Sequence, residues 1–265
     1  MCLVVFALHR HPGYPLIFAG NRDEFHERPT EAMHWWASPR VLAGRDRTAG
    51  GTWLGVTREG RFATVTNYRD PDEQRPDAVS RGQLVLDALA AEDMRRLGDT
   101  LEAAGHRYNG FNLIWGDPTG LYYYSNQDGR AQAVSPGVHG LSNGLLNTPW
   151  PKVLRVRQGL DRLLSAEAPV TSDALLGMLA DPRPAEEASL PDTGVPREWE
   201  RLLSSPFIVS PAYGTRASTV VLMAADGTIS VRERTFDTGG RPLGDQTYEW
   251  QARASNRHRS WITGH

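Results

Sequence analysis

The sequence predicts an α+β fold in which two β-sheets pack face to face between layers of helices. Two observations lead to this class. Two strand-like hairpins are predicted within residues 2–19 and 50–66, whereas residues 81–105 have the apolar spacing of helices that pack on a sheet. Strands and helices then follow again, down to a last strong hairpin near the C-terminus. Strands grouped in this way, rather than alternating strictly with helices, are typical of α+β domains.

The first hairpin is predicted from an apolar run and a turn signal. Residues 2–8 (CLVVFAL) are apolar on both faces, as in a strand that is buried on both sides. Pro12-Gly13 marks a turn, and residues 15–19 return as a second strand. Antiparallel pairing about this turn joins positions whose numbers sum to about 24. Cys2 is therefore expected opposite residue 22.

A second hairpin is predicted from residues 50–57 and 61–66, which flank a Glu59-Gly60 turn. Pairing there joins positions whose numbers sum to about 119, which places Asn67 beside Thr52. The glycines at positions 50 and 51 permit a tight turn or a close approach of the backbone to a ligand. The Asn67 amide is a candidate oxyanion donor, although asparagine is also a common turn former at strand ends.

The remaining elements are predicted by the same signals. Residues 70–79 are polar and contain proline, so we expect a loop there, followed by a helix with Ser80 as its N-cap. The other predicted elements are helices at 81–90, 91–105, 152–165 and 171–180, strands at 111–115, 121–125, 219–224 and 228–235, and a long surface loop at 181–200. Residues 1–252 are expected to form a single domain and residues 253–265 a mobile tail.

The composition excludes several classes of function. Hydrophobic residues make up 40% of the 265, charged residues 23%, and the net charge is −2, so no general attraction to nucleic acid or anionic membrane is expected. No apolar run approaches the ~20 residues of a membrane span. No signal peptide is evident, and we expect a cytoplasmic protein. A single cysteine excludes an internal disulfide framework, and no set of acidic and histidine residues has metal-ligand spacing.

Cys2, the only cysteine, directly follows Met1. Methionine aminopeptidases remove Met1 when the second residue is small, which would leave a thiol and a free α-amino group on one residue. Such an amine titrates near pH ~8 and can take the proton of the thiol. Cys2 would then carry both nucleophile and base. The alternative is an inert, buried cysteine at the start of a core strand.

The polar cluster Asn21-Arg22-Asp23-Glu24 is predicted to meet Cys2 at the end of the first hairpin. Arg22 is expected to stabilise the thiolate and to bind a carboxylate or carbonyl of the substrate. Asp23 is expected to hold the α-ammonium group. The alternative is a solvated loop with an Arg–Asp pair.

Taken together, the motifs resemble those of the NRDE family, called the transport and Golgi organisation protein 2 family in animals, over nearly the whole chain. In chain order the matching motifs are Met1-Cys2, Asn21-Arg22-Asp23-Glu24 with Arg28-Pro29, Gly44-Arg45-Asp46, Gly50-Gly51-Thr52-Trp53-Leu54-Gly55, Thr66-Asn67-Tyr68-Arg69, Ser80-Arg81-Gly82, Tyr108-Asn109-Gly110-Phe111-Asn112-Leu113, Gly140-Leu141-Ser142-Asn143, Thr148-Pro149-Trp150-Pro151-Lys152 and Gly214-Thr215-Arg216-Ala217-Ser218-Thr219.

These motifs are in turn similar to those of the N-terminal-nucleophile hydrolases, especially the bile-salt and penicillin V acylase group. The resemblance implies a four-layer αββα sandwich and catalytic roles for Cys2, Arg22, Asp23, Asn67, Asn143 and Arg216. One departure matters: that group separates its Arg and Asp by two residues, whereas Arg22 and Asp23 are adjacent and point to opposite faces of a regular strand. The same motifs nominate ligand-binding residues, namely Asn21, Glu24, Trp53, Tyr68, Arg69 and Lys152, the only lysine of the chain.

Two functions follow from the resemblance. The first is a Cys2-dependent amidase or acyl hydrolase that acts on a small acyl amide or thioester and requires no cofactor. The alternative is a carrier, because the NRDE family has been connected with haem handling and with lipid or acyl-CoA homeostasis. Haem would be an exchangeable ligand, with Cys2, His26 and His34 as candidate axial ligands and Trp35 and Trp36 as apolar walls. Either way the expected partner is a small molecule, and the oligomeric state stays open.

Overall fold

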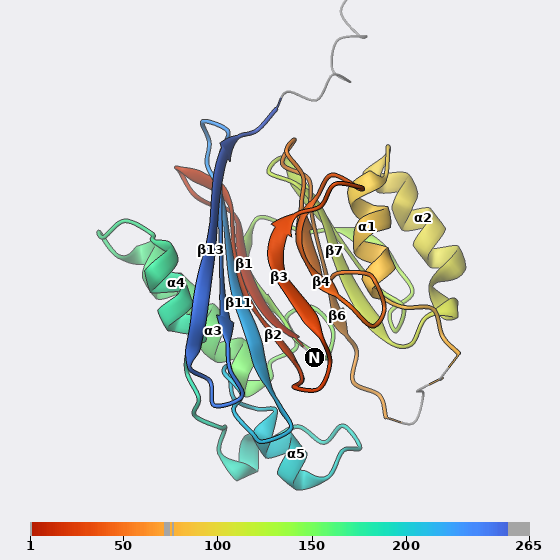
Figure 1. Cartoon of the computed structure of the whole chain (residues 1–265), viewed down its shortest axis with the longest axis vertical. Helices are drawn as coiled ribbons and strands as arrows, with labels where there is room; N and C mark the ends of the chain where they lie inside the picture. Colours follow the sequence, from red (N-terminus) through yellow and green to blue (C-terminus); the bar gives the residue numbers. More distant parts are fainter. Residues whose placement is uncertain (1, 72–74, 76, 254–265) are drawn as a thin grey trace, which may run out of the picture.

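Two antiparallel sheets stack face to face in the computed structural model, which describes residues 2–71, 75 and 77–253 (Figure 1). The six-stranded sheet A has the order β10 (Gly137–Leu141), β1 (Cys2–His11), β2 (Tyr14–Phe25), β11 (Tyr213–Met223), β12 (Thr228–Phe236) and β13 (Pro242–Gln251). The seven-stranded sheet B has the order β3 (Thr30–Trp35), β4 (Leu42–Asp46), β5 (Leu54–Val56), β6 (Phe62–Asn67), β7 (Phe111–Asp117), β8 (Gly120–Ser125) and β9 (Gln132–Ala133).

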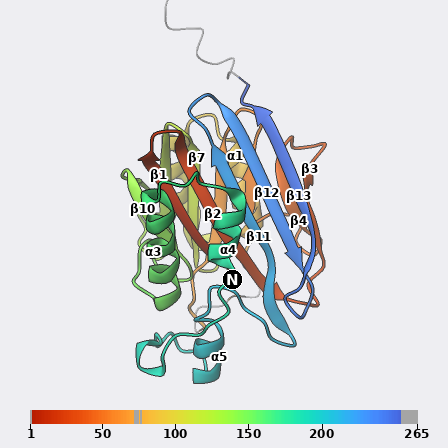
Figure 2. The same ribbon diagram turned by 90° about the vertical axis from the view of Figure 1, so that its left-hand side faces the viewer.

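Helices cover the outer face of each sheet. Helices α1 (Gly82–Ala90) and α2 (Met94–Ala104) pack on sheet B, and α3 (Pro151–Ser165) and α4 (Ser172–Leu179) pack on sheet A (Figures 1 and 2). Two short 3-10 helices (Gly105–Arg107 and Glu187–Ser189) and α5 (Arg197–Leu202) complete the described elements. The predicted four-layer αββα sandwich is thus confirmed.

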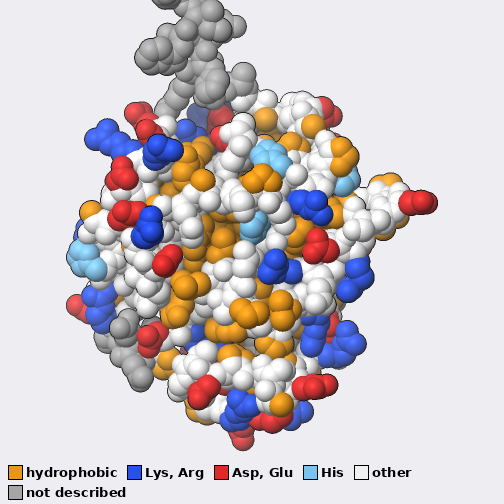
Figure 3. Space-filling view, turned by 180° about the vertical axis from the view of Figure 1, so that it is seen from behind, with side chains coloured by type: hydrophobic (Ala, Val, Ile, Leu, Met, Phe, Trp, Pro, Cys, Tyr) orange, Lys and Arg blue, Asp and Glu red, His pale blue; other side chains and the backbone are white. Residues whose placement is uncertain are grey.

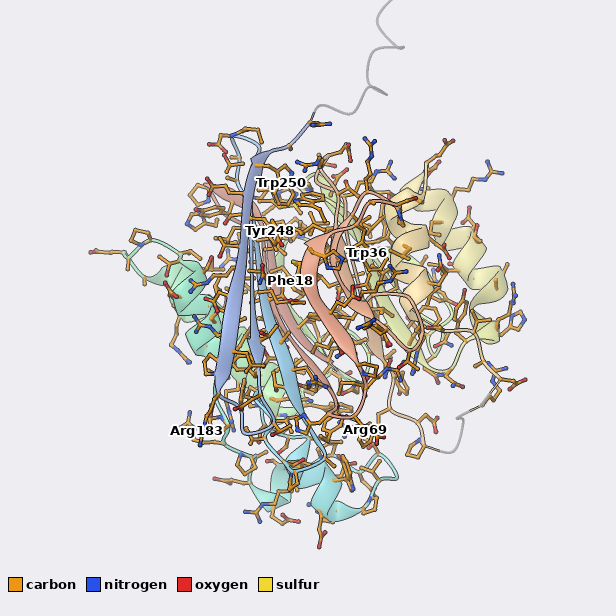
Figure 4. All side chains as sticks on the ribbon, viewed as in Figure 1. Phe18, Trp36, Arg69, Arg183, Tyr248 and Trp250 are labelled. Carbon is orange, nitrogen blue, oxygen red and sulfur yellow. The ribbon has the colours of Figure 1, made fainter. Side chains whose placement is uncertain are left out.

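Alternation along β1 explains why its whole sequence is apolar. Val4 and Phe6 belong to the core between the two sheets, whereas Leu3 and Val5 belong to a second core between sheet A and the helices α3 and α4. Successive side chains of a strand point to opposite faces, so a strand between two cores needs apolar residues at every position. Phe18 of β2 lies between the sheets (Figure 4).

The register of the first hairpin is as predicted, because Cys2 is the partner of Arg22 across β1 and β2. The strand β2 nevertheless continues to Phe25, through the polar cluster, since it pairs there with β11 as well. The register predicted for the second hairpin was wrong by one residue, because Leu54 pairs with Thr64 and not with residue 65. Its first strand is also shorter than predicted, because the preceding backbone is held against α1 by the bond from Thr52 N–H to the Gly82 carbonyl (3.3 Å).

Other differences come from segments whose sequence lacks periodicity. The edge strand β13 was not predicted, because its residues are mostly exposed and only Tyr248 and Trp250 pack against the core, so the strand depends largely on pairing with β12. Helix α5 begins within the segment predicted as a long loop, at Arg197, and runs past its predicted end at residue 200. Ser80 is not the N-cap of α1, which begins at Gly82 after Arg81. Of the predicted mobile tail only Arg253 is described, and the removal of Met1 also concerns a residue outside the described part.

No helix in the described part of the chain is long and apolar enough to cross a membrane. Seen from behind, the molecule carries hydrophobic side chains along the middle of the face, with charged side chains mostly nearer its rim (Figure 3).

Candidate active site

The site is built around Cys2, which begins β1 and is only 7% exposed. Arg22 lies directly opposite on β2, and partners across a ladder present their side chains on the same face. This face looks toward sheet B, because Cys2 belongs to the core between the sheets. The guanidinium of Arg22 donates to the Thr30 hydroxyl (3.4 Å) and lies 3.7 Å from the Glu24 carboxylate. Arg22 is thereby held at the thiol end of the hairpin.

A cavity of about 590 Å³ opens beside Cys2, within the size range of small-molecule sites. Both sheets and the segment before α1 supply its walls. Seven of the predicted site residues line it, namely Cys2, Arg22, Asp23, Glu24, Trp53, Asn67 and Arg216. The other five, which are not among the residues that line it, are Asn21, Tyr68, Arg69, Asn143 and Lys152.

Asn21 and Asp23 lie on the other face of β2, toward the helices. The Asn21 amide donates to the Leu179 carbonyl (3.1 Å) at the end of α4, and Asn21 Oδ1 accepts from the Ser218 hydroxyl (2.6 Å). Asn21 therefore joins sheet A to α4 rather than a ligand. The Asp23 carboxylate accepts from the Thr215 hydroxyl (2.7 Å) and still reaches the cavity wall. Alternate positions of β2 thus face sheet B and the helix layer, and Asp23 lines the cavity from the helix side.

Asn143 is tied to the oxyanion candidate Asn67. Its side-chain amide donates to the Asn67 carbonyl (2.8 Å), and its Oδ1 accepts from the Ser142 hydroxyl (3.1 Å). The same Ser142 hydroxyl donates to the Cys2 carbonyl at 3.0 Å. The turn after β10 therefore links the nucleophile strand to the end of β6, while the Asn67 side chain lines the cavity.

Arg216 lies at a β-bulge, where the pairing of β11 with β2 shifts between Thr215 and Ala217. Its Nη1 donates to the carbonyls of Phe25 (3.1 Å) and His26 (3.2 Å). Burial lowers the pKa of Arg216, and the nearby Arg22 lowers it further. Two guanidinium groups therefore face one end of the cavity, an arrangement suited to an anionic group of a ligand.

The thiol of Cys2 is not stabilised as a thiolate in the way that the sequence predicted. Burial raises the pKa of the Cys2 thiol above its ordinary value, and the attraction of Arg22 does not offset this effect. The expected stabilisation of a thiolate by Arg22 is therefore too weak to dominate, because burial removes the water that would solvate the charged sulfur. Burial thus favours the neutral thiol of Cys2, which needs a base for attack.

Arg69 and Lys152 lie behind the cavity wall. Arg69 forms a buried ion pair with Glu200 of α5 at 2.8 Å, and its guanidinium lies 4.9 Å from the centre of the Trp150 ring. Tyr68 is bound through its backbone N–H to the Gly110 carbonyl (2.8 Å). These residues support the wall that carries Asn67.

Two cavity residues were missed as functional candidates. Glu233 of β12 is 2% exposed and accepts from the Met33 N–H (2.6 Å), and burial raises its pKa. The alternation of Ile229 and Val231 along the predicted strand was a usable signal, because it places position 233 on the same buried face. Arg81, beside α1, also lines the cavity, and burial lowers its pKa.

The two histidines proposed as haem ligands are not at the cavity. His26 bonds to the Ser210 carbonyl (3.0 Å), and His34 is exposed beside Glu31. The residues that line the cavity include none of His26, His34, Trp35 and Trp36. Of the three proposed axial ligands, only Cys2 lines it. The histidine donors thus do not fit a haem in this cavity.

Comparison with known proteins places the chain in a family. The sequence model described as Transport and Golgi organisation 2 matches residues 1–238. A transport and Golgi organization protein 2 homolog of Bos taurus is 38% identical over 274 aligned positions, which cover 95% of this chain and 96% of that protein. The homolog of Homo sapiens is 35% identical over 258 positions, which cover 89% and 93%.

Solved structures with similar shape are distant in sequence. A mutant of conjugated bile acid hydrolase from Clostridium perfringens has a TM-score of 0.48 at 10% identity, covering 98% of this chain and all of that one. A Caenorhabditis elegans ortholog of N-acylethanolamine-hydrolyzing acid amidase has a TM-score of 0.45 at 9% identity, covering 83% and 92%. On the family match and the sequence relatives, the chain belongs to the Transport and Golgi organisation 2 family.

Proposed function

We propose that this protein is a hydrolase that uses Cys2 to cleave a small acyl amide or thioester. The observation that carries the proposal is the position of Cys2. The only cysteine of the chain is the first residue of the central strand β1 and lines a cavity of small-molecule size, with Arg22 directly opposite. An inert core cysteine needs no cavity and no buried cation beside it. The cytoplasm, where a lone thiol stays reduced, is the location that this proposal assigns.

In the proposed mechanism the sulfur of Cys2 attacks the carbonyl carbon of the acyl group. The α-amino group of Cys2, freed by removal of Met1, takes the thiol proton and passes it to the leaving amine or thiol. Because burial raises the pKa of the thiol, proton transfer must accompany the attack. The carbon–sulfur bond forms first, as the carbonyl π electrons move to oxygen and give a tetrahedral oxyanion. Collapse of this intermediate breaks the bond to the protonated leaving group and leaves a thioester on Cys2, which water then hydrolyses to release the acid and restore the thiol.

The cavity wall offers groups for the other tasks. The Asn67 amide is assigned to the oxyanion, and the bond from Asn143 to the Asn67 carbonyl holds that residue in place. Arg22 and Arg216 are assigned to a negatively charged or carbonyl group of the substrate. Trp53 supplies an apolar wall for the acyl chain.

The test is turnover of a panel of acyl amides and acyl thioesters by the wild type, Cys2→Ser and Cys2→Ala. We expect at least one substrate whose hydrolysis falls by orders of magnitude in both variants, since loss of a nucleophile is rarely tolerated. Arg183→Ala, a change of an exposed side chain remote from the cavity, is the control. The intact mass of the protein shows whether the α-amino group of Cys2 can act as the base. If Met1 is fully retained, Cys2 has no free α-amine.

The carrier alternative has one observation in its favour. Arg22, Arg81 and Arg216 all line the cavity, so an anionic ligand would be held there without any reaction. Titration with haem and with an acyl-chain carboxylate tests it. Saturable binding that survives Cys2→Ala, with no turnover across the panel, would favour a carrier over the hydrolase.

A further inference from the structure

Lys152 is a buried cation that the proposed mechanism does not use. It lies in the first turn of α3, its side chain is 1% exposed, and its Nζ has no hydrogen-bond partner among the described residues. A buried lysine without a hydrogen bond is costly, so an arrangement that keeps one needs compensating charge nearby. It is also the only lysine of the chain.

The compensating charges come from several elements around Lys152. The charged and titratable groups that act on Lys152 itself are Asp23 of β2, Arg69 after β6, Cys2 of β1 and Glu200 of α5. Asp23 is in turn influenced by Arg22, its neighbour on β2, and by the α-amino group of the chain. Lys152 and Arg69 are the cations, and Asp23 and Glu200 are the carboxylates. Glu200 is directly paired with Arg69, which makes Asp23 the carboxylate whose charge acts most strongly on Lys152.

The position of Lys152 is fixed by the packing of α3. Val153, its neighbour, and Val156 belong to the core that α3 shares with Leu3 and Val5 of β1. A Cβ on Gly140 of β10 would lie 2.8 Å from the Val153 side chain, so helix and strand are in close contact. Lys152 therefore cannot move away from the end of β1 without loss of this core.

We propose that Lys152 is a positioning residue: from behind sheet A, its ammonium favours negative charge on Asp23 and on the thiolate of Cys2 as it forms. The role rests on the proposed function, because it assists the attack by Cys2. It differs from the ligand-binding role that the motif implies, since Lys152 is not among the residues that line the cavity. The positive charge acts through the protein interior, where charges are screened less than in water.

The charge on Lys152 depends on pH in an accessible range. Burial lowers the pKa of Lys152 to about 8, and the attraction of Asp23 opposes this effect only in part. The cation is therefore present below pH 8 and is lost above it. The interaction is mutual: a thiolate on Cys2 raises the pKa of Lys152, so a charged Lys152 lowers the pKa of Cys2.

The experiment measures the rate of Cys2 alkylation by iodoacetamide from pH 6.5 to about pH 9.5, a range that spans the titration of Lys152 and of a free α-amine. The variants are Lys152→Met and Lys152→Arg, with Arg157→Met as the matched control, a cation further along α3 that bonds to the Val138 carbonyl. The ratio of wild-type to variant rates is the readout, because any titration of the α-amine at Cys2 cancels in it. Thermal melting checks that each variant is folded.

We expect the wild type to react about two- to threefold faster than Lys152→Met at pH 7, as for a thiol pKa lower by about 0.3–0.5, because Arg22 and Glu24 act on the Cys2 thiol more strongly than Lys152 does. This ratio should fall toward one as the pH passes through about 8. Lys152→Arg, which keeps its charge, should match the wild type at pH 7 and exceed it above pH 9. Arg157→Met should follow the wild type throughout.

A wild-type to Lys152→Met ratio that does not change with pH would overturn the proposal and leave Lys152 a purely structural role. If Lys152→Met does not fold, the comparison of wild type with Lys152→Arg decides, and parallel profiles contradict the proposal. Alkylation needs no substrate, so this result stands apart from the panel of acyl substrates. If no acyl substrate in the panel is turned over, the alkylation profiles still test the role of Lys152.

Discussion

Cys2 and Arg22 are direct partners across the β1–β2 ladder, with both side chains on the face of sheet A that looks toward sheet B. This pairing places a guanidinium beside a thiol, yet the burial of Cys2 and the charge of Arg22 act on the thiol in opposite directions. Burial raises the pKa of the thiol, whereas Arg22 lowers it by a smaller amount. The site therefore holds a protonated thiol next to a fixed cation.

Alkylation of native Cys2 should accordingly be slower at pH 7 than alkylation of free cysteine. Arg22→Gln should slow it again, by up to about tenfold for a further pKa rise of one unit. Arg28→Gln removes another cation of the cavity wall, one paired with Asp46, and is the matched control. Iodoacetamide kinetics followed by mass spectrometry measure both. A native rate above that of free cysteine would show that burial does not control this thiol.

Asn67 and Asn143 should differ in their effect on turnover once a substrate is found. Asn67→Ala removes the assigned oxyanion donor and should lower kcat by about 10²–10³. Asn143→Ala leaves the Asn67 carbonyl without its side-chain donor, and it should reduce stability by about 1–3 kcal/mol. Steady-state kinetics and urea denaturation separate the two effects. Equal losses of kcat with unchanged stability would contradict the distinction.

Gly51→Ala should destabilise the cavity wall. A Cβ there would lie 2.5 Å from the backbone of Gly82, closer than real Cβ atoms come, so the loop or the start of α1 must shift. Gly244→Ala is the control, because nothing lies within 4 Å of its added Cβ. We expect a loss of about 1–3 kcal/mol for Gly51→Ala, as for other overpacked sites, and little change for Gly244→Ala. Equal unfolding free energies for both variants would contradict the close approach.

The buried pair of Arg69 and Glu200 should matter far more than an exposed pair. Their side chains are 5% and 1% exposed, so Glu200→Ala leaves an uncompensated buried guanidinium and should cost about 3–5 kcal/mol. Glu187→Ala removes the partner of Arg197 in an exposed pair and should cost at most about 1 kcal/mol. Chemical denaturation of both variants is the measurement. A loss below that of the control would mean that Arg69 finds another partner or reaches water.

Glu233 should make the stability depend on pH. Burial raises the pKa of this carboxyl above 4.5, so the folded state binds the proton more tightly than the unfolded state. The stability contributed by the neutral acid is present below pH 4.5 and is lost as the pH rises through the folded pKa. Glu233→Gln keeps an acceptor for the Met33 N–H and should remove this loss, whereas Glu249→Gln, on the exposed side of β13, should not. Unfolding free energies measured between pH 4 and 8 test this, and identical slopes for the wild type and Glu233→Gln would contradict it.

Local patterns were sufficient where the interacting residues are close along the chain. The apolar run of β1, the turn at Gly13 and the strand-like return of β2 predict the register that brings Cys2 opposite Arg22. They predict it because a short hairpin has little freedom to slip once its buried faces are set. The opposite orientations of Arg22 and Asp23 follow from the same alternation. The order of strands and helices predicted two sheets between layers of helices, and the family resemblance implied the four-layer αββα sandwich. The two helix-covered sheets confirm both predictions.

Contacts between distant segments could not be read in this way. Arg69 and Glu200 are 131 positions apart, and Asn67 and Asn143 are 76 apart, so no local periodicity relates them. The motifs predicted Lys152 and Asn143 as site residues. The packing of α3 places Lys152 behind the cavity wall, and the turn after β10 places Asn143 there. The pKa of Cys2 likewise depends on burial between two sheets, because desolvation is set by every segment that excludes water from the thiol.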